Sequence, residues 1–245
     1  MKGIVLAGDS GNRLHPLTLG IPKQLLPIYN IPMIYHPIDL LIKSGVRDIM
    51  IITSVEHNAM FKENLGDGTK WNASFYYACQ TTPDGIAQAI NIAQDFIGKD
   101  SVCLITGDTI IVGDGFEKIL EKAIKAADKS AHATVFVDHE PEDKQYGRVL
   151  LDDKGSFKSI VGTSEDNWYY SITGVYVFPN NVLNHMDEIT LSERNKYEIT
   201  SVTKLFHEEN KLQIQKIPNN CIWFDTNTPD NILKCSIYMQ KKSKQ

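Results

Sequence analysis

The chain has 245 residues, of which 42% are hydrophobic and 22% are charged. This composition is typical of a globular protein with a sizeable core and excludes a disordered chain. The formal net charge of −5 argues against a nucleic-acid polymer as partner, because such partners need a basic surface. A small polyanionic substrate would instead have to be bound by a few well-placed cations or by a metal ion.

Membrane segments and cysteine pairs are not expected. No apolar run reaches the roughly 18 residues that a membrane span needs, and Met1-Lys2 leads directly into a strand-like segment without a signal-peptide pattern. We therefore expect a cytoplasmic protein with no membrane partner. The four cysteines show no C-x-x-C spacing, which favours buried thiols over a zinc site or a disulfide framework.

In the first half of the chain, apolar strand-like runs alternate with segments of helical periodicity. Such alternation predicts right-handed β-α-β units and a mostly parallel sheet, and therefore an α/β fold. Two of the predicted helices are followed by Gly45 and Gly98, residues that commonly end helices. The predicted strands are residues 3–7, 48–53, 74–79 and 102–106, and the predicted helices are residues 32–44, 85–97 and 116–127.

After about residue 130, strand-like segments follow one another with turns between them, which indicates a mixed or antiparallel region. The predicted strands are 133–138, 147–151, 157–161, 173–178, 213–216 and 221–224, with a hairpin turn at 152–155 and helices at 199–208 and from 228 or 229 to about 240. No linker separates the two regions. We therefore expect one domain over residues 1–245, with a lobe of about residues 1–130 and a smaller mixed or antiparallel lobe of about residues 131–245.

A glycine-bearing turn follows the first predicted strand. Gly8 and Gly11 would let backbone amides approach phosphate oxygens closely. Beyond the turn, Arg13 can bind phosphate through its planar fork, and Lys23 can act as a mobile point charge. The turn has neither the Gly-Lys-Ser/Thr of a Walker loop nor the third glycine of a dinucleotide fingerprint, so an oxidoreductase is a remote alternative. An ordinary strand, turn and polar loop is the alternative without function.

Carboxylates follow two of the predicted strands. Asp108 comes after residues 102–106, and Asp225 comes after residues 221–224. Two carboxylates at strand ends can hold one Mg²⁺, an ion that prefers oxygen ligands and commonly keeps waters and substrate phosphates in its shell. Either aspartate alone can equally form a turn.

Polar residues also follow the third predicted strand. Gln80 can recognise a base edge, because its amide both donates and accepts hydrogen bonds. Gly85 follows a few residues later, at the start of the next predicted helix. The alternative for this segment is structural, with Thr82 or Asp84 capping the helix.

Together, these segments resemble the sugar-1-phosphate nucleotidyltransferases, in order and over nearly the whole chain. The closest resemblance is to the thymidylyltransferases of that family, in a short form without the C-terminal helices that carry an allosteric site in longer members. The combination is far more specific than any single motif. The resembling segments are residues 2–14, 23–27, 32–35, 80–89, 107–108, 146–147, 173–174, 198–200 and 223–226.

The resemblance implies a Rossmann-like fold and the condensation of a nucleoside triphosphate with a sugar 1-phosphate, giving a nucleoside-diphosphate sugar and pyrophosphate. It implies dTTP, glucose 1-phosphate or a variant acceptor, Mg²⁺ and a homo-oligomer. The implied residues are Arg13 and Lys23 for catalysis, Asp108 and Asp225 for the metal, Gly8, Ser10, Gly11, Gln24, Gln80 and Gly85 for the nucleotide, and Tyr146, Gly147 and Tyr176 for the sugar.

The chain departs from the family pattern at Asn12 and Ser201, and more consequentially at two further places. Asp9 stands in the phosphate loop, where a carboxylate would repel a triphosphate unless it points away or joins the metal shell. Val161 and Gly162 stand where a Glu-Lys pair is expected to hold the sugar phosphate. We therefore expect a changed acceptor, with a catalytically impaired, nucleotide-binding relative in a regulatory or scaffold role as the alternative.

Overall fold

The computed structural model describes residues 1–9, 11–139, 148–151, 157–161 and 169–244. Its strands are β1 (Lys2–Ala7), β2 (Pro27–Ile28), β3 (Ile31–Pro32), β4 (Asp48–Ser54), β5 (Ser74–Gln80), β6 (Val102–Thr106), β7 (Ile110–Gly113), β8 (Ala133–His139), β9 (Arg148–Leu151), β10 (Phe157–Val161), β11 (Tyr169–Phe178), β12 (Leu212–Lys216) and β13 (Cys221–Phe224). The main sheet has the order β10-β9-β11-β6-β1-β4-β5, β8 pairs with β11 and β12, and β7–β13 and β2–β3 form separate ribbons.

The helices are α1 (Tyr35–Lys43), α2 (Asn58–Leu65), α3 (Gln88–Ile92), α4 (Gln94–Ile97), α5 (Phe116–Ser130), α6 (Val182–His185), α7 (Ile199–Glu208) and α8 (Pro229–Lys242). Three single 3-10 turns, at Asn12–Leu14, Lys23–Leu25 and Thr69–Trp71, complete the helical elements of the described residues.

The four strands of the first half form the parallel part of the sheet. β6, β1, β4 and β5 lie side by side, with Gly3 of β1 between Cys103 of β6 and Ile49 of β4. Their buried, β-branched side chains have helices on both faces, as parallel strands require. Because the strands are parallel, the residues that follow Ala7, Gln80 and Thr106 lie at one edge of the sheet. The predicted parallel sheet is confirmed.

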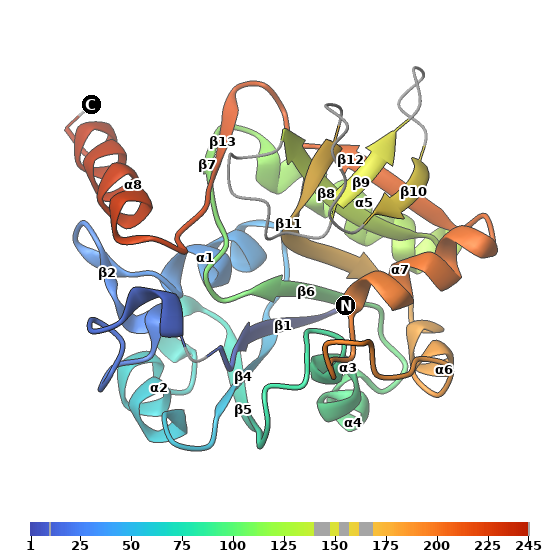
Figure 1. Ribbon diagram of the computed structural model, residues 1–245, viewed down its shortest axis with the longest axis horizontal. Coiled ribbons are helices and arrows are strands. Elements are labelled where there is room, and N and C mark those ends of the chain that lie inside the picture. Colours follow the sequence, from blue (N-terminus) through green and yellow to red (C-terminus); the bar gives the residue numbers. More distant parts are fainter. Residues whose placement is uncertain (10, 140–147, 152–156, 162–168, 245) are drawn as a thin grey trace.

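The second half adds antiparallel strands to the same sheet. β11 runs antiparallel to β6 and continues past its carboxyl end, where it pairs with β9 and with the end of β8. Figure 1 shows β8, β9 and β10 grouped on one side of the β6–β1 centre. The fold is therefore a mostly parallel mixed sheet with a smaller antiparallel region, as the sequence predicts.

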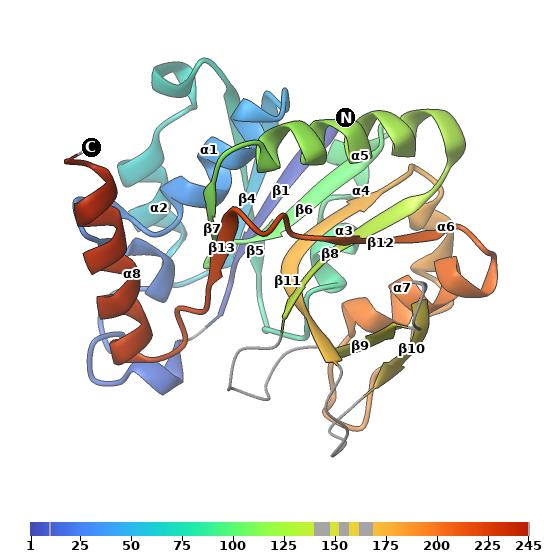
Figure 2. The same ribbon diagram turned by 90° about the horizontal axis from the view of Figure 1, so that it is seen from above.

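Helices cover both faces of the main sheet (Figure 2). On one face α1, α2 and α5 bury a cluster that includes Ile38, Phe61 and Leu120. On the other face α3, α4, α6 and α7 bury a second cluster that includes Ile90 and Phe206. The carboxyl ends of β1, β5 and β6 lie on the same side of the sheet, which is where open α/β sheets bind their ligands.

The β7–β13 ribbon and α8 form a third packing unit. Ile110 and Val112 of β7 pack with Ile28, Met33 and Cys235, and Cys235 lies on α8. This unit was only partly predicted, because β7 is four residues long and begins two residues after Asp108. The residues around it read as a turn, and the pairing with β13 comes from a distant part of the sequence.

Other differences from the predicted elements have local causes. The helix expected from residue 32 begins at Tyr35, because Ile31–Pro32 pairs with β2. The helix expected at 85–97 begins at Gln88 and is interrupted at Ala93. Helices α2 and α6 were not predicted, and the hairpin turn at 152–155 lies outside the described residues.

Two further expectations concern membranes and thiols. Among the described residues, no helix is both long and apolar enough to cross a membrane. All four cysteines are free, and Cys103, Cys221 and Cys235 are buried. A buried thiol, expected for Cys79 and Cys103, is found at Cys103, whereas Cys79 is only partly buried.

His36, in the first turn of α1, leads to a prediction about stability. Its Nε2 is buried without a hydrogen-bond partner among the described residues. Burial lowers the pKa of His36 to about 4, against a weaker opposing effect of Asp39. The unfolded chain therefore binds the extra proton first as the pH falls below about 6.5, so the free energy of unfolding falls between about pH 6.5 and pH 4.

We expect His36→Gln to lose this part of the pH dependence, because glutamine does not titrate. Urea unfolding at pH 7 and pH 5 measures it. The difference between the two pH values should be smaller in the variant than in the wild-type protein, and equal differences would contradict the assignment.

Candidate active site

The turn after β1 begins the site. Gly11 has a φ of 64° and precedes the 3-10 turn Asn12–Leu14, and its carbonyl accepts a hydrogen bond of 2.8 Å from Thr18. A Cβ at Gly11 would meet Thr18 and the Lys23 side chain at 3.1 Å. The turn therefore needs glycine for its conformation and because Lys23 packs against it. Ser10 lies outside the described residues.

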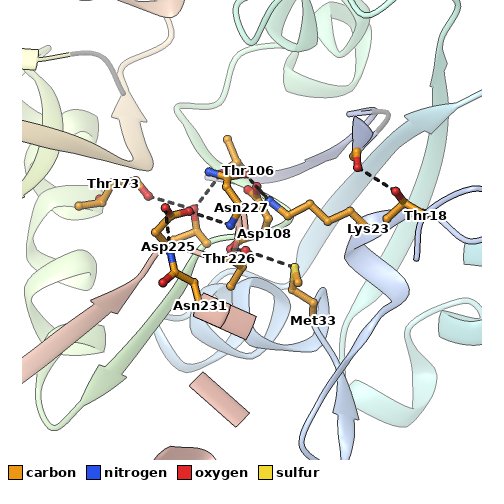
Figure 3. Close-up of polar contacts among 12 residues, drawn as sticks. Thr18, Lys23, Met33, Thr106, Asp108, Thr173, Asp225, Thr226, Asn227 and Asn231 are labelled. Carbon is orange, nitrogen blue, oxygen red and sulfur yellow. Dashed lines mark hydrogen bonds and ion pairs between the residues drawn. The ribbon is translucent and has the colours of Figure 1, made fainter. Parts of the chain in front are cut away.

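Lys23 is the most unusual charged residue of the described chain, because its side chain is 1% exposed. Its Nζ donates to Asp108 Oδ2 at 2.5 Å and to Asn227 Oδ1 at 2.7 Å (Figure 3). A buried ammonium without partners would cost several kcal/mol, on the order of 3–5. The two partners lie 85 and 204 residues from Lys23 in the sequence. Their hydrogen bonds offset the cost of burying the ammonium.

Asp108 is the charged partner of Lys23. Burial acts to raise the pKa of Asp108, but the Lys23 charge and hydrogen bonds from Lys23 and Thr106 outweigh it, so the pKa lies below the ordinary carboxyl value. The carboxylate is therefore ionised at neutral pH. One quarter of its side chain remains exposed, so it is open to a ligand.

Asp225 reaches the same place through the β7–β13 ribbon. Phe224 pairs with Ile110, so the antiparallel register sets Asp225 beside the residues that precede β7. Asp225 is 7% exposed, and its two oxygens accept hydrogen bonds from Asn227 N at 2.8 Å and Asn231 Nδ2 at 3.3 Å. Figure 3 shows Asp108, Asp225 and Lys23 converging from three elements.

Thr226 connects the two carboxylates through the backbone. Its hydroxyl donates to the carbonyl oxygen of Asp108 at 3.2 Å and also contacts Met33 Sδ at 3.6 Å. The loop after β13 is thereby fixed to the loop after β6.

The donor set at this place fits a hard divalent cation. Asp108 and Asp225 supply carboxylate oxygens, and each carboxylate has lone pairs beyond the hydrogen bonds described above. Among the described residues, no group of three or more His, Cys, Asp or Glu side chains could enclose a metal by itself. Two carboxylates with open positions suit Mg²⁺, which commonly keeps waters and substrate phosphates in its shell.

A hydroxyl network supports the loop that carries Asp108. Thr106 and Thr109 share a hydrogen bond of 2.7 Å, and Thr109 Oγ1 donates to the carbonyl oxygen of Thr173 at 2.9 Å. Gly174, with a φ of 81°, lies against both hydroxyls. At this point β11 shifts its register against β8, between Ile172 and Tyr176. The register shift in β11 thus lies where Gly174 packs against the threonines at the end of β6 and in the loop that follows it.

The predicted base-binding residues form a second polar group. Gln80 Nε2 donates to the Gly85 carbonyl oxygen at 3.1 Å and to Gln88 Oε1 at 2.5 Å. Both amide N–H groups are thus used, and Oε1, which lies over Gly8, remains as an acceptor. A Cβ at Gly85 would collide with the backbone of Tyr197. Gly85 is therefore required by chain packing, whatever it binds.

Gln24 is a further predicted nucleotide-binding residue, beside Gly107. It is 1% exposed, and its Oε1 is buried without a hydrogen-bond partner among the described residues. Its Cγ would be 3.1 Å from a Cβ at Gly107, so it lies at the end of β6. An unpartnered buried acceptor needs a reason, and a ligand donor is one.

Arg13 and Asp9 lie on the exposed side of the first loop. The structure thus brings Lys23, Asp108 and Asp225 together in the interior and leaves Arg13 at the surface. The carboxylate of Asp9 is in contact with solvent, which lessens the repulsion that a triphosphate would meet.

Of the residues predicted to bind the sugar, only Tyr176 lies within the described part of the chain. Tyr176 is 3% exposed and stacks on Phe178; burial raises its pKa, and the charges of Glu198 and Asp108 add to this. Tyr146, Gly147 and Gly162 lie outside the described residues. The backbone register nevertheless pairs Val161 with Arg148, so the ends of β9 and β10 that lead to these residues are adjacent.

The sequence analysis missed Asn227, and also the hydroxyls of Thr106, Thr109 and Thr226. Threonines near strand ends carry no distinctive signal. Asn227 lies only two residues after the predicted metal ligand Asp225, but nothing in the sequence around it indicates that its side chain meets Lys23.

Comparisons with known proteins identify the family of this chain. Residues 2–242 match the family model described as nucleotidyl transferase. A glucose-1-phosphate thymidylyltransferase of Neisseria meningitidis is 38% identical over 243 residues, which are 98% of this chain and 83% of that protein. The enzyme of the same name from Mycolicibacterium smegmatis is 35% identical over 241 residues, with 98% and 82% covered.

Solved structures of similar proteins share this fold. A Bacillus anthracis protein assigned as a glucose-1-phosphate thymidylyltransferase, crystallised with a sucrose, superimposes with a TM-score of 0.88 at 30% identity and covers 97% of this chain and 94% of its own. A UDP-glucose pyrophosphorylase complexed with UDP-glucose shares the fold, with a TM-score of 0.83 at 18% identity and 98% of each chain covered.

The fit of Gly174 against Thr106 and Thr109 gives a prediction. A Cβ there would lie 2.5 Å and 2.6 Å from the two hydroxyl oxygens, at a positive φ. Gly174→Ala should lower the free energy of unfolding by about 2–4 kcal/mol, the sum of left-handed strain and overpacking. The control is Gly45→Ala, with a φ of 91° but open space around it, for which we expect about 1 kcal/mol. Equal losses in denaturant titrations would show that the contact with the threonines has no effect.

Proposed function

Because this chain belongs to the nucleotidyl transferase family, we propose that it transfers a nucleotidyl group from a nucleoside triphosphate to a sugar 1-phosphate. The products are a nucleoside-diphosphate sugar and pyrophosphate. The observation that carries the proposal is the ion pair between the buried Lys23 and the partly exposed Asp108, close to Asp225 and at the carboxyl ends of the parallel strands. A cation and two carboxylates at that edge are the groups that phosphoryl chemistry requires.

In this reaction the sugar phosphate attacks the α-phosphorus, and pyrophosphate leaves. Asp108 and Asp225 hold a divalent ion, which when bound neutralises phosphate charge and orients the phosphate oxygens. Lys23 places its ammonium on the α-phosphate oxygens, and Arg13 binds the leaving pyrophosphate through its fork. No covalent enzyme intermediate is needed, because positioning and charge stabilisation suffice.

The nucleotide lies along the loop after β1 and the end of β5. The backbone amides near Gly8, Ser10 and Gly11 meet the phosphates. Gln24 Oε1, which has no partner among the described residues, accepts from a hydroxyl of the ribose. Gln80 uses its Nε2 within the protein, so its carbonyl accepts from the base near Gly85. An acceptor suits the ring N–H of thymine or uracil, which supports dTTP as the donor.

The acceptor lies against the smaller lobe. Tyr146, Gly147 and Tyr176 face the sugar in this proposal, and glucose 1-phosphate is the first acceptor to test, because the relatives described above carry that name. Val161 and Gly162 replace an expected Glu-Lys pair. Losing the charged hydrogen bond of that lysine weakens a phosphate by roughly ten- to a hundredfold, so other sugar phosphates belong in the same test.

A homo-oligomer is also part of the proposal, and α8 supports it. Leu233 and Ile237 are 58% and 44% exposed and lie one turn apart. Asp230 and Lys241 are exposed at the two ends of the same stripe. If two copies of α8 pack antiparallel, Leu233 of one copy meets Ile237 of the second copy, and Asp230 meets Lys241. A stripe that is complementary to itself in shape and charge fits a twofold dimer.

The reaction is tested by pyrophosphate release with Mg²⁺ over a panel of nucleoside triphosphates and sugar 1-phosphates. We expect release with dTTP and one hexose 1-phosphate. Asp108→Asn removes a metal ligand and Lys23→Ala removes the ammonium, so each should lower turnover by at least about a hundredfold. Unchanged rates in both variants would exclude the mechanism.

Silence of the wild-type protein over the whole panel, with nucleotide still bound in calorimetry, would instead favour a binding protein without turnover. Addition of EDTA is the matched control for the metal, and it should abolish any release that Mg²⁺ supports.

The dimer is tested by light scattering during size exclusion. We expect the wild-type protein to show twice the mass of the chain and Leu233→Glu to show the mass of one chain. The matched control is Val55→Glu, at a side chain 57% exposed and far from α8 in sequence, which should stay dimeric. A monomeric wild-type protein, or a dimeric Leu233→Glu, would refute this contact.

A further inference from the structure

The ammonium of Lys23 has two acceptors of different kinds. Asp108 Oδ2 is charged and lies at 2.5 Å, whereas Asn227 Oδ1 is neutral and lies at 2.7 Å. Asp108 is one quarter exposed, but Lys23 and Asn227 are 1% and 6% exposed. The charged contact is thus at the open side of the site, and the neutral contact is in its interior.

The charged contact conflicts with metal binding. On the proposed function, on which this inference rests, Asp108 is a ligand of a divalent cation. Two cations at one small carboxylate repel each other, at an energy that is large where water is scarce. Lys23 uses only Oδ2 of Asp108, so a metal ion can bind the second oxygen, and the repulsion between the two cations then weakens the contact of Lys23 with Asp108.

We propose that Asn227 is the positioning residue that retains the Lys23 ammonium during this exchange. If Asn227 were absent, the Lys23 ammonium would have no acceptor among the described contacts once it moved away from Asp108. A buried cation without an acceptor costs far more free energy than a cation that loses one of two acceptors. With Asn227, the ammonium keeps one strong hydrogen bond in the interior and stays at the site, ready for a phosphate oxygen.

The surroundings of Asn227 suit this role. Its backbone N–H donates to Asp225 Oδ1 at 2.8 Å, and the neighbouring Thr226 hydroxyl donates to the Asp108 carbonyl oxygen. The backbone that carries Asn227 is thus bonded directly to the Asp225 carboxylate, and through Thr226 to the backbone of Asp108. Because the side-chain amide is neutral, it also adds no charge that would compete for the metal ion.

The test is a double-mutant cycle read by Mn²⁺ binding to the nucleotide-free protein in titration calorimetry. The four proteins are the wild type, Asn227→Ala, Lys23→Met and the double variant. Asn227→Ala should weaken Mn²⁺ binding by about ten- to a hundredfold, the worth of one charged hydrogen bond. Lys23→Met removes the competing ammonium and should bind Mn²⁺ more tightly than the wild type. In that background Asn227→Ala should have no further effect.

Asn231→Ala is the matched control, because Asn231 also donates to Asp225 but does not contact Lys23 in the hydrogen bonds described. It should change Mn²⁺ affinity equally with and without Lys23. If Lys23→Met does not fold, as judged by its circular dichroism and melting curve, Lys23→Gln replaces it in the same cycle.

Three results overturn the proposal: an unchanged affinity in Asn227→Ala, an equal loss in both backgrounds, or no Mn²⁺ binding by the wild-type protein. Pyrophosphate release is measured in parallel, so that the two proposals fail separately. Turnover without the expected coupling rejects only the role of Asn227. The expected coupling without turnover on any substrate pair rejects only the proposed reaction.

Discussion

The site depends on one constraint, which is that the ammonium of Lys23 is buried and must be paired. A lysine that is 1% exposed is tolerated only where acceptors are fixed around it. Those acceptors come from the end of β6 and from the segment after β13, so three distant parts of the chain have to meet. The pairing thus imposes order on loops that would otherwise be free to vary.

The β7–β13 ribbon positions the third of these parts, the segment after β13. It lies outside the main sheet and packs through Ile110 and Val112 against α8 and the β2–β3 region. Its register, with Phe224 opposite Ile110, fixes Asp225 and Asn227 relative to the loop that carries Asp108. A slip of this ribbon by one residue would turn its side chains to opposite faces and would separate the carboxylates.

The sequence predicts the parallel strands well, because Ile49, Ile51 and Ile52 are buried on both faces of the sheet and belong to one continuous apolar run. It predicts Lys23, Asp108 and Asp225 as site residues because each follows a strand or a glycine turn, although their roles remain predictions. It does not predict β7 or Asn227. Both depend on contacts between residues about a hundred or more positions apart, and short-range sequence patterns do not predict such contacts.

The close contact between Gly85 and Tyr197 has a consequence for how the two halves of the chain move. Tyr197 N donates to Asp84 O at 2.5 Å, Ala87 N donates to Tyr197 O at 3.2 Å, and Lys196 bonds the carbonyl oxygen of Pro83. The loop after β5 is therefore tied by its backbone to the segment that leads into α7. Because backbone hydrogen bonds join the two segments, we expect a displacement of the loop after β5 to displace the segment before α7 as well.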